Sequence, residues 1–381
     1  MKEATLTRAL QRYEQSPHLV FWETTKACAL ACGHCRASAQ LNALPGELTT
    51  DEGKLLIDQI AAMPGPPPIL VFTGGDCLAR EDLHELIRFA RTRGLRLGVA
   101  PSVSPRLNRA SLQALHALGV RSISISLDGS SAVSHDSLRG IDGHFDQTVA
   151  ALQMMRSMGF RVQVNTTVMK RNAHELADIL SVLGDVGVSI WEVFFLVGVG
   201  RGRDIQEVTA PQAEAICHFL VDAARFGVTV RTVEAPFFRR VQVEREAPLS
   251  GAPRPLDALY GVLRAGLPDE RVGARRATSH TLATGDGRGV IFVGFDGEVH
   301  ASGFLPVPLG NIKTQALADI YADNALLRTL RSGQLEGACG RCDYRRLCGG
   351  SRARAFAATG RVLGEDPSCV RTRSPLALMA G

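Results

Sequence analysis

Short apolar runs alternate with segments of helical periodicity from residue 19 to about residue 233. The apolar runs are rich in Val, Ile and Phe, as strands are, and cover residues 19–25, 68–73, 95–101, 122–127, 160–168 and 189–197. Between them, apolar residues recur at helical spacing, as in Leu83, Leu86, Ile87 and Ala90. Repeated strand–helix units predict a parallel sheet, because a parallel return needs a crossover. The predicted fold class is therefore α/β, and six units fit an incomplete (β/α)6 TIM-like barrel about as well as an open doubly wound sheet.

Local signals place several helix boundaries. Thr50-Asp51-Glu52 and Ser104-Pro105 are typical of helix starts, and Gly94, Gly119 and Gly159 are typical of helix stops. In either type of parallel sheet, ligands bind at the carboxyl ends of the strands. The residues that carry chemistry in this chain follow predicted strands, so we expect them to meet at one edge of the sheet.

Residues 235–287 interrupt the strand–helix pattern with five prolines and eight arginines. They predict a connecting segment with one helix over residues 256–265. After it, residues 289–295, Asp296-Gly297 and residues 298–301 predict a hairpin with a tight turn, and residues 315–331 predict a helix. We therefore expect an N-terminal extension (1–18), a core barrel (19–235), a connecting segment (236–288) and a smaller α+β domain (289–381).

Composition excludes several classes of protein. Hydrophobic residues make up 45% of the chain and charged residues 21%, which argues against a largely disordered protein. No apolar run approaches the roughly 18–20 residues of a membrane span, and the N-terminus lacks the apolar core of a secretory signal. The net charge of +5 is too slight to predict nucleic-acid binding. We expect a cytoplasmic protein that binds neither membrane nor nucleic acid.

The nine cysteines are the most informative residues of the chain. Seven of them fall into two groups, and the other two, Cys77 and Cys217, have no partner by spacing. Their odd number and the missing export signal make a disulfide framework improbable, so a metal or catalytic site is expected. Cys77 and Cys217 are read as small buried hydrophobic residues.

The first group, Cys28, Cys32 and Cys35, follows the first predicted strand with C-x3-C-x2-C spacing. Three thiolates from one loop can hold three corners of a cubane iron–sulfur cluster, which normally takes four cysteines. The fourth iron then stays open, and an open metal position is typical of catalytic sites. A zinc site is the alternative that the spacing alone allows.

Two further motifs extend this pattern, Gly74-Gly75-Asp76 after the second predicted strand and Ser126-Leu127-Asp128-Gly129 at the end of the fourth. Together the three motifs resemble the radical SAM superfamily. The resemblance implies an enzyme in which a 4Fe–4S cluster passes one electron to bound S-adenosylmethionine (SAM). The resulting 5′-deoxyadenosyl radical then abstracts hydrogen from a substrate. A flavodoxin- or ferredoxin-type protein is the implied electron donor.

The same resemblance assigns roles in SAM binding. It places His34 against the adenine, Asp76 near the ammonium and Arg139 on the methionine carboxylate. Ser126 and Asp128 would approach the ribose, while Asn165 and residues 195–202 would line the adenosyl pocket. The implied SAM-binding residues are His34, Gly74, Gly75, Asp76, Ser126, Asp128, Arg139 and Asn165. Asp76 and Cys77 depart from the usual Glu and Pro of the second motif.

The second group, Cys339, Cys342, Cys348 and Cys369, has C-x2-C-x5-C-x20-C spacing. Four thiolates can saturate a second cluster, and a zinc ribbon is the alternative. The tail resembles the SPASM domain, which holds two auxiliary clusters in its full form. Ser302 and Arg352 stand where that form has two further cysteines. The resemblance therefore implies one auxiliary 4Fe–4S cluster with four cysteine ligands, a possible acceptor for the electron left on the substrate.

The substrate remains open between two classes. Segments such as Phe21-Trp22-Glu23-Thr24-Thr25 and His34-Cys35-Arg36-Ala37 resemble the corresponding segments of one group of radical SAM proteins. That group modifies siroheme-derived tetrapyrroles in heme biosynthesis, for example by oxidative decarboxylation. Arg36 and the arginines of residues 236–276 would bind carboxylates, unless that stretch is only a solvated connection. The alternative is a maturase of ribosomal peptides. The 18 residues before the first strand are too few for a leader-binding domain. A non-catalytic iron–sulfur or zinc redox protein is the third interpretation.

Overall fold

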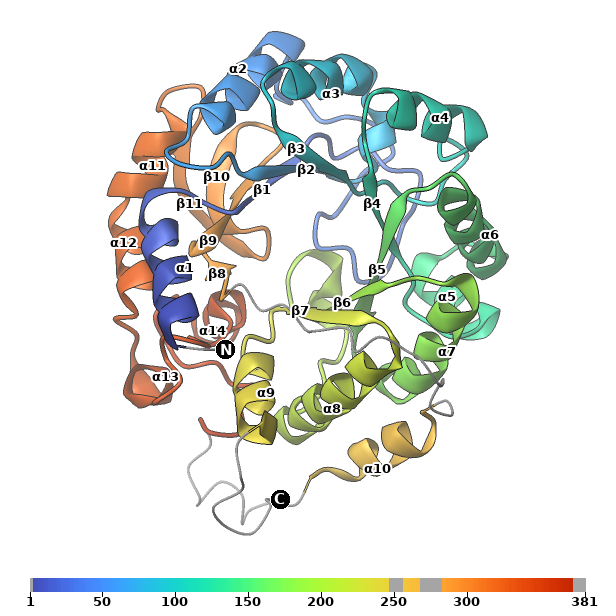
Figure 1. The fold of residues 1–381 in the computed structure, drawn as a ribbon, viewed down its shortest axis with the longest axis vertical. Coiled ribbons are helices and arrows are strands. Elements are labelled where there is room, and N and C mark those ends of the chain that lie inside the picture. Colours follow the sequence, from blue (N-terminus) through green and yellow to red (C-terminus); the bar gives the residue numbers. More distant parts are fainter. Residues whose placement is uncertain (1–2, 247–255, 268–282, 373–381) are drawn as a thin grey trace.

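A twisted sheet forms the centre of the protein, and its first seven strands run parallel in chain order (Figure 1). The computed structural model describes residues 3–246, 256–267 and 283–372. The parallel strands are β1 (Leu19–Glu23), β2 (Ile69–Thr73), β3 (Arg96–Val99), β4 (Ser122–Ser126), β5 (Arg161–Val168), β6 (Ile190–Phe195) and β7 (Thr229–Val233). The six predicted strands are confirmed. β7 was not predicted, because Thr229–Val233 contains only two apolar residues and so lacks the apolar run of its neighbours.

Helices cover the outer face of this sheet (Figure 1). They are α2 (Thr50–Ala61), α3 (Leu83–Thr92), α4 (Arg109–Ala117), α5 (Ala132–Arg139), α6 (His144–Ser157), α7 (Leu176–Val186) and α8 (Ala210–Ala223). Outward-facing strand residues such as Trp22 and Phe72 are fully buried against them. Burial of this continuous apolar layer stabilises the barrel by about 25 cal/mol for each Å² removed from water.

Most predicted helix boundaries are confirmed. Thr49 and Glu52 form a capping box at the start of α2, and the predicted glycine stops all have positive φ. The start of α4 differs from the prediction at Ser104-Pro105. Asn108 caps that helix reciprocally with Ser111, while the Ser104 hydroxyl donates to Asp76.

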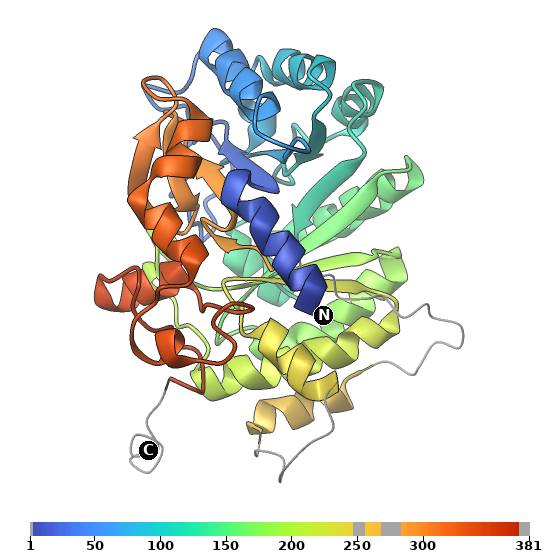
Figure 2. The same ribbon diagram turned by 60° about the vertical axis from the view of Figure 1, so that its left-hand side comes forward.

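The C-terminal part continues the barrel sheet on the open side of β1 (Figure 2). β8 (Gly285–Asp286), β9 (Gly289–Val293), β10 (Glu298–Ser302) and β11 (Leu305–Asn311) form this part of the sheet. β9 pairs in parallel with β1, and the turn at Gly297 joins it to antiparallel β10, which confirms the predicted hairpin. α1 (Glu3–Gln15) lies against this extension, where Tyr321 donates its hydroxyl to the Tyr13 carbonyl.

The helix predicted over residues 315–331 is two helices, α11 (Leu317–Asp323) and α12 (Ala325–Ser332). They separate at Asn324, whose side chain accepts hydrogen bonds from the first backbone amides of α12. α13 (Gly337–Arg341) and α14 (Arg352–Thr359) follow and carry or flank the second cysteine group.

The connecting segment contains α9 (Phe238–Glu246) and α10 (Ala258–Ala265). α10 was predicted, whereas α9 was not, because its many charged residues leave no apolar periodicity. Residues 247–255 and 268–282 lie outside the described part of the chain.

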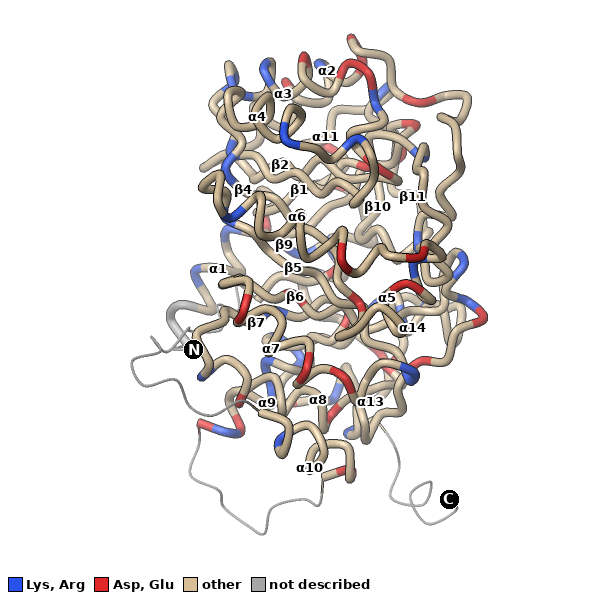
Figure 3. The backbone as a smooth tube through the Cα atoms, turned by 90° about the vertical axis from the view of Figure 1, so that its right-hand side faces the viewer, with Lys and Arg blue, Asp and Glu red and all other residues tan. Residues whose placement is uncertain are grey.

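Lys and Arg positions are interspersed with Asp and Glu positions along the backbone (Figure 3). This distribution matches the small net charge of +5. Across the three described ranges, no helix combines the length and apolar character that a membrane crossing requires.

Candidate functional site

The first cysteine group lies in a loop that leaves β1 and closes on itself. The Cys28 amide donates to the Gln40 carbonyl at 2.7 Å, and the Gln40 amide donates to the Lys26 carbonyl at 2.9 Å. The Cys35 amide donates to the Cys32 carbonyl at 3.2 Å. All three thiols therefore belong to one short, hydrogen-bonded loop at the carboxyl end of β1. Burial raises the pKa of Cys28, which favours the thiol until a positive charge or metal is present.

The two glycines of Gly74-Gly75-Asp76 let the end of β2 lie directly against this loop. A Cβ atom at Gly74 would lie 2.5 Å from the Thr25 carbonyl oxygen, and one at Gly75 would lie 2.5 Å from that of Ala27. The Gly75 amide donates to Thr25 at 2.8 Å, and the Asp76 amide donates to Ala27 at 2.7 Å. The glycines are thus required by a close backbone approach.

Asp76 is buried and its carboxylate is held by the loop after β3. It accepts hydrogen bonds from the Ser104 hydroxyl at 2.8 Å, the Ser102 amide at 3.2 Å and the Leu78 amide at 3.1 Å. Burial raises the pKa of Asp76 despite these donors. The carboxylate positions the β3 loop, and its contact with a SAM ammonium stays a prediction.

Ser102 is a site residue that sequence analysis missed. Its hydroxyl lies 3.5 Å from the Cys28 sulfur and donates to the Gly75 carbonyl at 3.1 Å. Ser102 follows the end of β3, so the rule that ligands bind at strand ends would have included it. It joins the first cysteine to the second motif.

Asp128, Arg139, His34 and Cys32 form one buried cluster. Arg139 donates to Asp128 and lies 3.5 Å from the Cys32 sulfur. The His34 Nε2 atom lies 3.2 Å from the Asp128 carboxylate, which also accepts the Thr167 amide at 2.7 Å. Sequence-distant residues of the predicted pocket are therefore brought together beside the cysteine loop.

The electrostatics of this cluster favour a fixed ion pair. Burial alone would raise the pKa of Asp128, but Arg139 and His34 lower it well below its ordinary range. Burial opposes the charge of Arg139, but Asp128 and Cys32 raise the pKa of its guanidinium. Arg139 Nε and His34 Nδ1 are buried and have no partner among the described residues. These two polar atoms fit a polar ligand such as SAM beside the three thiols.

Ser126 and Asn165 lie opposite each other in neighbouring strands β4 and β5. The Asn165 side chain accepts a hydrogen bond from Gln163 at 2.8 Å. Residues 195–202 lead from β6 to the back of the cysteine loop, where Arg201 donates to the Cys32 and Ala39 carbonyls, each at 2.9 Å. This run supports the loop, and its place in an adenosyl pocket stays a prediction.

The second cysteine group surrounds one pocket. Its lining includes Cys339, Cys342, Cys348 and Cys369, together with Arg240 and Arg371. The sulfurs receive backbone hydrogen bonds, from Gly350 to Cys348 and from Asp366 to Cys339, each at 3.4 Å. Burial raises the pKa of Cys348 to about 12 and that of Cys369 to about 11.

The chemistry of this donor set fits a polynuclear cluster. A cubane spreads four thiolates over four irons and receives N–H···S hydrogen bonds that tune its potential. The four cysteines and their amide donors match that requirement.

The two remaining cysteines and two arginines of the connecting segment, Arg239 and Arg240, make structural contacts. Cys77 and Cys217 are fully buried in the hydrophobic core. Arg240 pairs with Glu214 and Glu244, and Arg239 donates to backbone carbonyls, so these two arginines hold α9 in place. The alternative of a solvated connection therefore does not apply to Arg240, which is 3% exposed. The arginines at 254, 271, 275 and 276 lie outside the described residues.

Arg36 follows Cys35 directly in the cysteine loop after β1. Its guanidinium stacks over the Phe292 ring at 4.7 Å, pairs with Glu23 at 2.9 Å and donates to the Gly303 carbonyl at 3.1 Å. The side chain thus joins the cysteine loop to the C-terminal extension of the sheet.

Comparison with known proteins agrees with this arrangement. The sequence model of the Radical SAM superfamily matches residues 22–183. The AdoMet-dependent heme synthase of Methanosarcina barkeri is 35% identical over 93% of this chain and 97% of its own. The protein of the same name from Nitratidesulfovibrio vulgaris is 33% identical over 95% and 94%.

A solved structure shares the complete fold. Streptococcus suis SuiB bound to precursor peptide SuiA superposes with a TM-score of 0.67, covering 97% of this chain and 80% of SuiB. The sequence identity is only 12%. This likeness therefore concerns the architecture of a barrel with a C-terminal extension.

Proposed function

Because the chain belongs to the radical SAM superfamily, we propose that Cys28, Cys32 and Cys35 hold a 4Fe–4S cluster with one open iron. SAM would bind at that iron, beside Arg139 and His34. Together the bound cluster and SAM supply a carbon-centred radical that removes a hydrogen atom from the substrate. The observation that carries this proposal is the buried Asp128–Arg139–His34 cluster against Cys32, with its two unpartnered nitrogen atoms.

The chain's own residues would bind, orient and shield these groups. Arg139 stays charged in the protein interior because the buried carboxylate of Asp128 pairs with its guanidinium. A guanidinium held in this way offers a fixed donor to a carboxylate. Gly75 and Ser102 would keep the β2 and β3 ends against the cysteine loop, in which Cys28 and Cys32 are each 8% exposed.

The second cysteine group would hold an auxiliary 4Fe–4S cluster. Four cysteines line its pocket, and amide hydrogen atoms point at two of the sulfurs. A saturated cluster offers no open iron, so its proposed task is to accept one electron from the substrate radical. A flavodoxin- or ferredoxin-type protein is the proposed donor to the first cluster.

The proposed substrate is a tetrapyrrole with carboxylate side chains. Two relatives named AdoMet-dependent heme synthase match nearly the full chain at 35% and 33% identity. In the proposed reaction, a hydrogen atom leaves a propionate side chain, CO2 departs, and one electron passes to the auxiliary cluster. A vinyl group remains, so the overall change is an oxidation. Arg36, beside Cys35, is the described arginine placed to guide a carboxylate. Peptide modification is less favoured, since SuiB shares only the fold.

The test is product formation by reduced protein that is reconstituted without oxygen. We expect SAM cleavage to 5′-deoxyadenosine, coupled to the loss of CO2 from an iron porphyrin that carries propionates, such as iron coproporphyrin III. Replacing Cys28, Cys32 and Cys35 with Ala should abolish both products. A fully loaded protein that cleaves no SAM would contradict the radical activity, and cleavage coupled only to a peptide would contradict the substrate class.

A further inference from the structure

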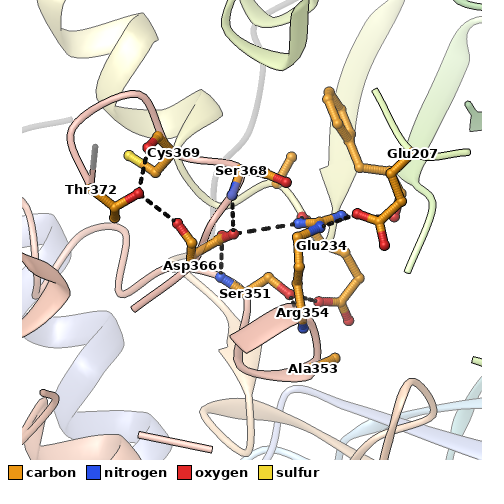
Figure 4. A network of polar contacts seen from close by, with 12 residues as sticks. Glu207, Glu234, Ser351, Ala353, Arg354, Asp366, Ser368, Cys369 and Thr372 are labelled. Carbon is orange, nitrogen blue, oxygen red and sulfur yellow. Dashed lines mark hydrogen bonds and ion pairs between the residues drawn. The ribbon is translucent and has the colours of Figure 1, made fainter. Parts of the chain in front are cut away.

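A buried arginine, Arg354, joins the barrel to the second cysteine site (Figure 4). It lies in α14 and is 3% exposed. Its guanidinium donates to the Leu196 carbonyl at 2.9 Å and the Phe195 carbonyl at 3.2 Å, where β6 ends. It also donates to the Glu234 carbonyl at 2.6 Å, directly after β7. The flat, five-donor guanidinium can serve these several acceptors at once, which a lysine cannot do.

Two carboxylates compensate the charge of Arg354. Glu207 accepts from its Nε atom at 2.9 Å, and Asp366 lies 3.8 Å from its Nη1 atom. Burial opposes the charge of the guanidinium, but Asp366 and Glu207 raise its pKa. Arg354 is therefore a permanent positive charge between the barrel and the loop that carries Cys369.

Asp366 extends this contact to the second cysteine group. Its side chain is fully buried and accepts the Ser351 amide at 2.8 Å and the Ser368 amide at 3.0 Å. Its own amide donates to the Cys339 sulfur at 3.4 Å, and its carbonyl accepts the Cys369 amide at 3.2 Å. One residue thus contacts two of the four cysteines and faces Arg354.

Glu234 fixes the start of α14 from the barrel side. It is buried with φ of +57°, a left-handed conformation that is uncommon for a residue other than glycine. Its carboxyl group accepts from the Ser302 hydroxyl at 3.1 Å and from the hydroxyl of Ser351, the N-cap of α14. Arg354 is consequently anchored at its backbone as well as at its guanidinium.

We propose that Arg354 is a positioning residue that sets the reduction potential of the group held by the second cysteines, acting through Asp366. The inference rests on the proposed auxiliary cluster. A nearby positive charge favours electron uptake and a nearby negative charge opposes it, and N–H···S hydrogen bonds stabilise the reduced cluster. Arg352 donates directly to the Cys339 sulfur at 3.7 Å, and Arg240 and Arg371 line the pocket. Arg354 adds a further positive charge through Asp366 and holds Asp366 so that its amide stays on Cys339.

Opposite charge changes at the two positions provide the test. Arg354→Gln removes the positive charge, and we expect electron uptake by the auxiliary cluster to weaken about tenfold, a fall of about 59 mV for one electron. Asp366→Asn removes the negative charge but keeps the backbone amide, so the reduction potential of the auxiliary cluster should rise in this variant. The readout is an anaerobic redox titration followed by electron paramagnetic resonance. Arg361→Gln is the matched control, because that arginine follows α14 and its side chain is 69% exposed.

Each outcome separates this inference from the proposed function. A parent protein with only about four irons would contradict the auxiliary cluster, and this role of Arg354 with it. A parent with both clusters, but shifts of equal sign or no shift in the two variants, would overturn the role of Arg354 alone. If Arg354→Gln loses the cluster, Arg354→Lys and Asp366→Asn decide the question. The lysine variant keeps the charge but not all of the hydrogen bonds, so its cluster potential should fall by less than about 59 mV. The cluster potential of the asparagine variant must still rise.

Discussion

At the scale of single residues, the site depends on charges that are buried and paired. Asp128 is fully buried, and Arg139 is its direct ionic partner. Arg139→Met should destabilise the fold by about 3–5 kcal/mol, because it removes the guanidinium that compensates the charge of a fully buried carboxylate. The double variant with Asp128→Asn should recover part of this loss, as coupled residues do not contribute additively. Chemical denaturation of the four proteins measures the coupling, and additive losses would contradict it.

The buried carboxyl group of Glu234 makes the stability of the folded protein depend on pH. Burial, followed by the neighbouring charge of Asp286, raises its pKa. The folded protein therefore keeps a proton that the unfolded chain releases above a pH of about 4.3. The stability linked to this group is fully present below that pH and is lost as the pH rises through the raised value. Melting temperatures from pH 5 to 8 should fall more for the parent than for Glu234→Gln, and a constant difference would contradict this.

At the scale of elements, the site needs the end of β2 to touch the cysteine loop. Gly75→Ala would place a Cβ 2.5 Å from the Ala27 carbonyl, so the loop must shift. We expect loss of the first cluster and about half of the iron. Gly261→Ala is the matched control, since a Cβ added at that position of α10 would meet nothing within 4 Å and alanine stabilises a helix by roughly 0.5–1 kcal/mol. Full iron in Gly75→Ala would argue against the close contact.

The elements also show how far a sequence can be interpreted. Strands with continuous apolar runs were predictable, whereas β7 was missed because Arg231 and two threonines interrupt its run. The start of α4 was misplaced because the Ser104 hydroxyl donates a hydrogen bond to Asp76 instead of capping a helix. Cysteine spacing predicted both proposed metal sites, but the sequence has no signal that pairs Asp128 with Arg139 and His34. Such pairing depends on tertiary contacts between the β1 loop, β4 and α5.

At the scale of the whole molecule, one continuous sheet links the barrel to the C-terminal part that carries the second cysteine group. β9 pairs with β1, from whose end the first cysteine loop leaves. Arg354 connects the barrel edge to the second site. These contacts join the barrel to the part that carries the second site, and the proposed electron transfer would run between them.

This arrangement predicts a separation of functions. Cys348→Ala should keep SAM cleavage but block formation of the oxidised product, because the electron acceptor is lost. Chromatography of 5′-deoxyadenosine and of the porphyrin measures both in one reaction. Cys217→Ala is a suitable control, since Cys217 is buried in the core and not in the lining of the pocket. Normal product formation by Cys348→Ala would contradict the acceptor role.

The most direct test of the account is the content of iron, sulfide and zinc per chain after anaerobic purification and reconstitution. Two cubane clusters predict about eight irons and eight sulfides with no zinc. About four irons with one zinc would contradict the auxiliary cluster and leave a redox-neutral radical reaction. Protein that binds no iron through Cys28, Cys32 and Cys35 would contradict the proposed chemistry as a whole.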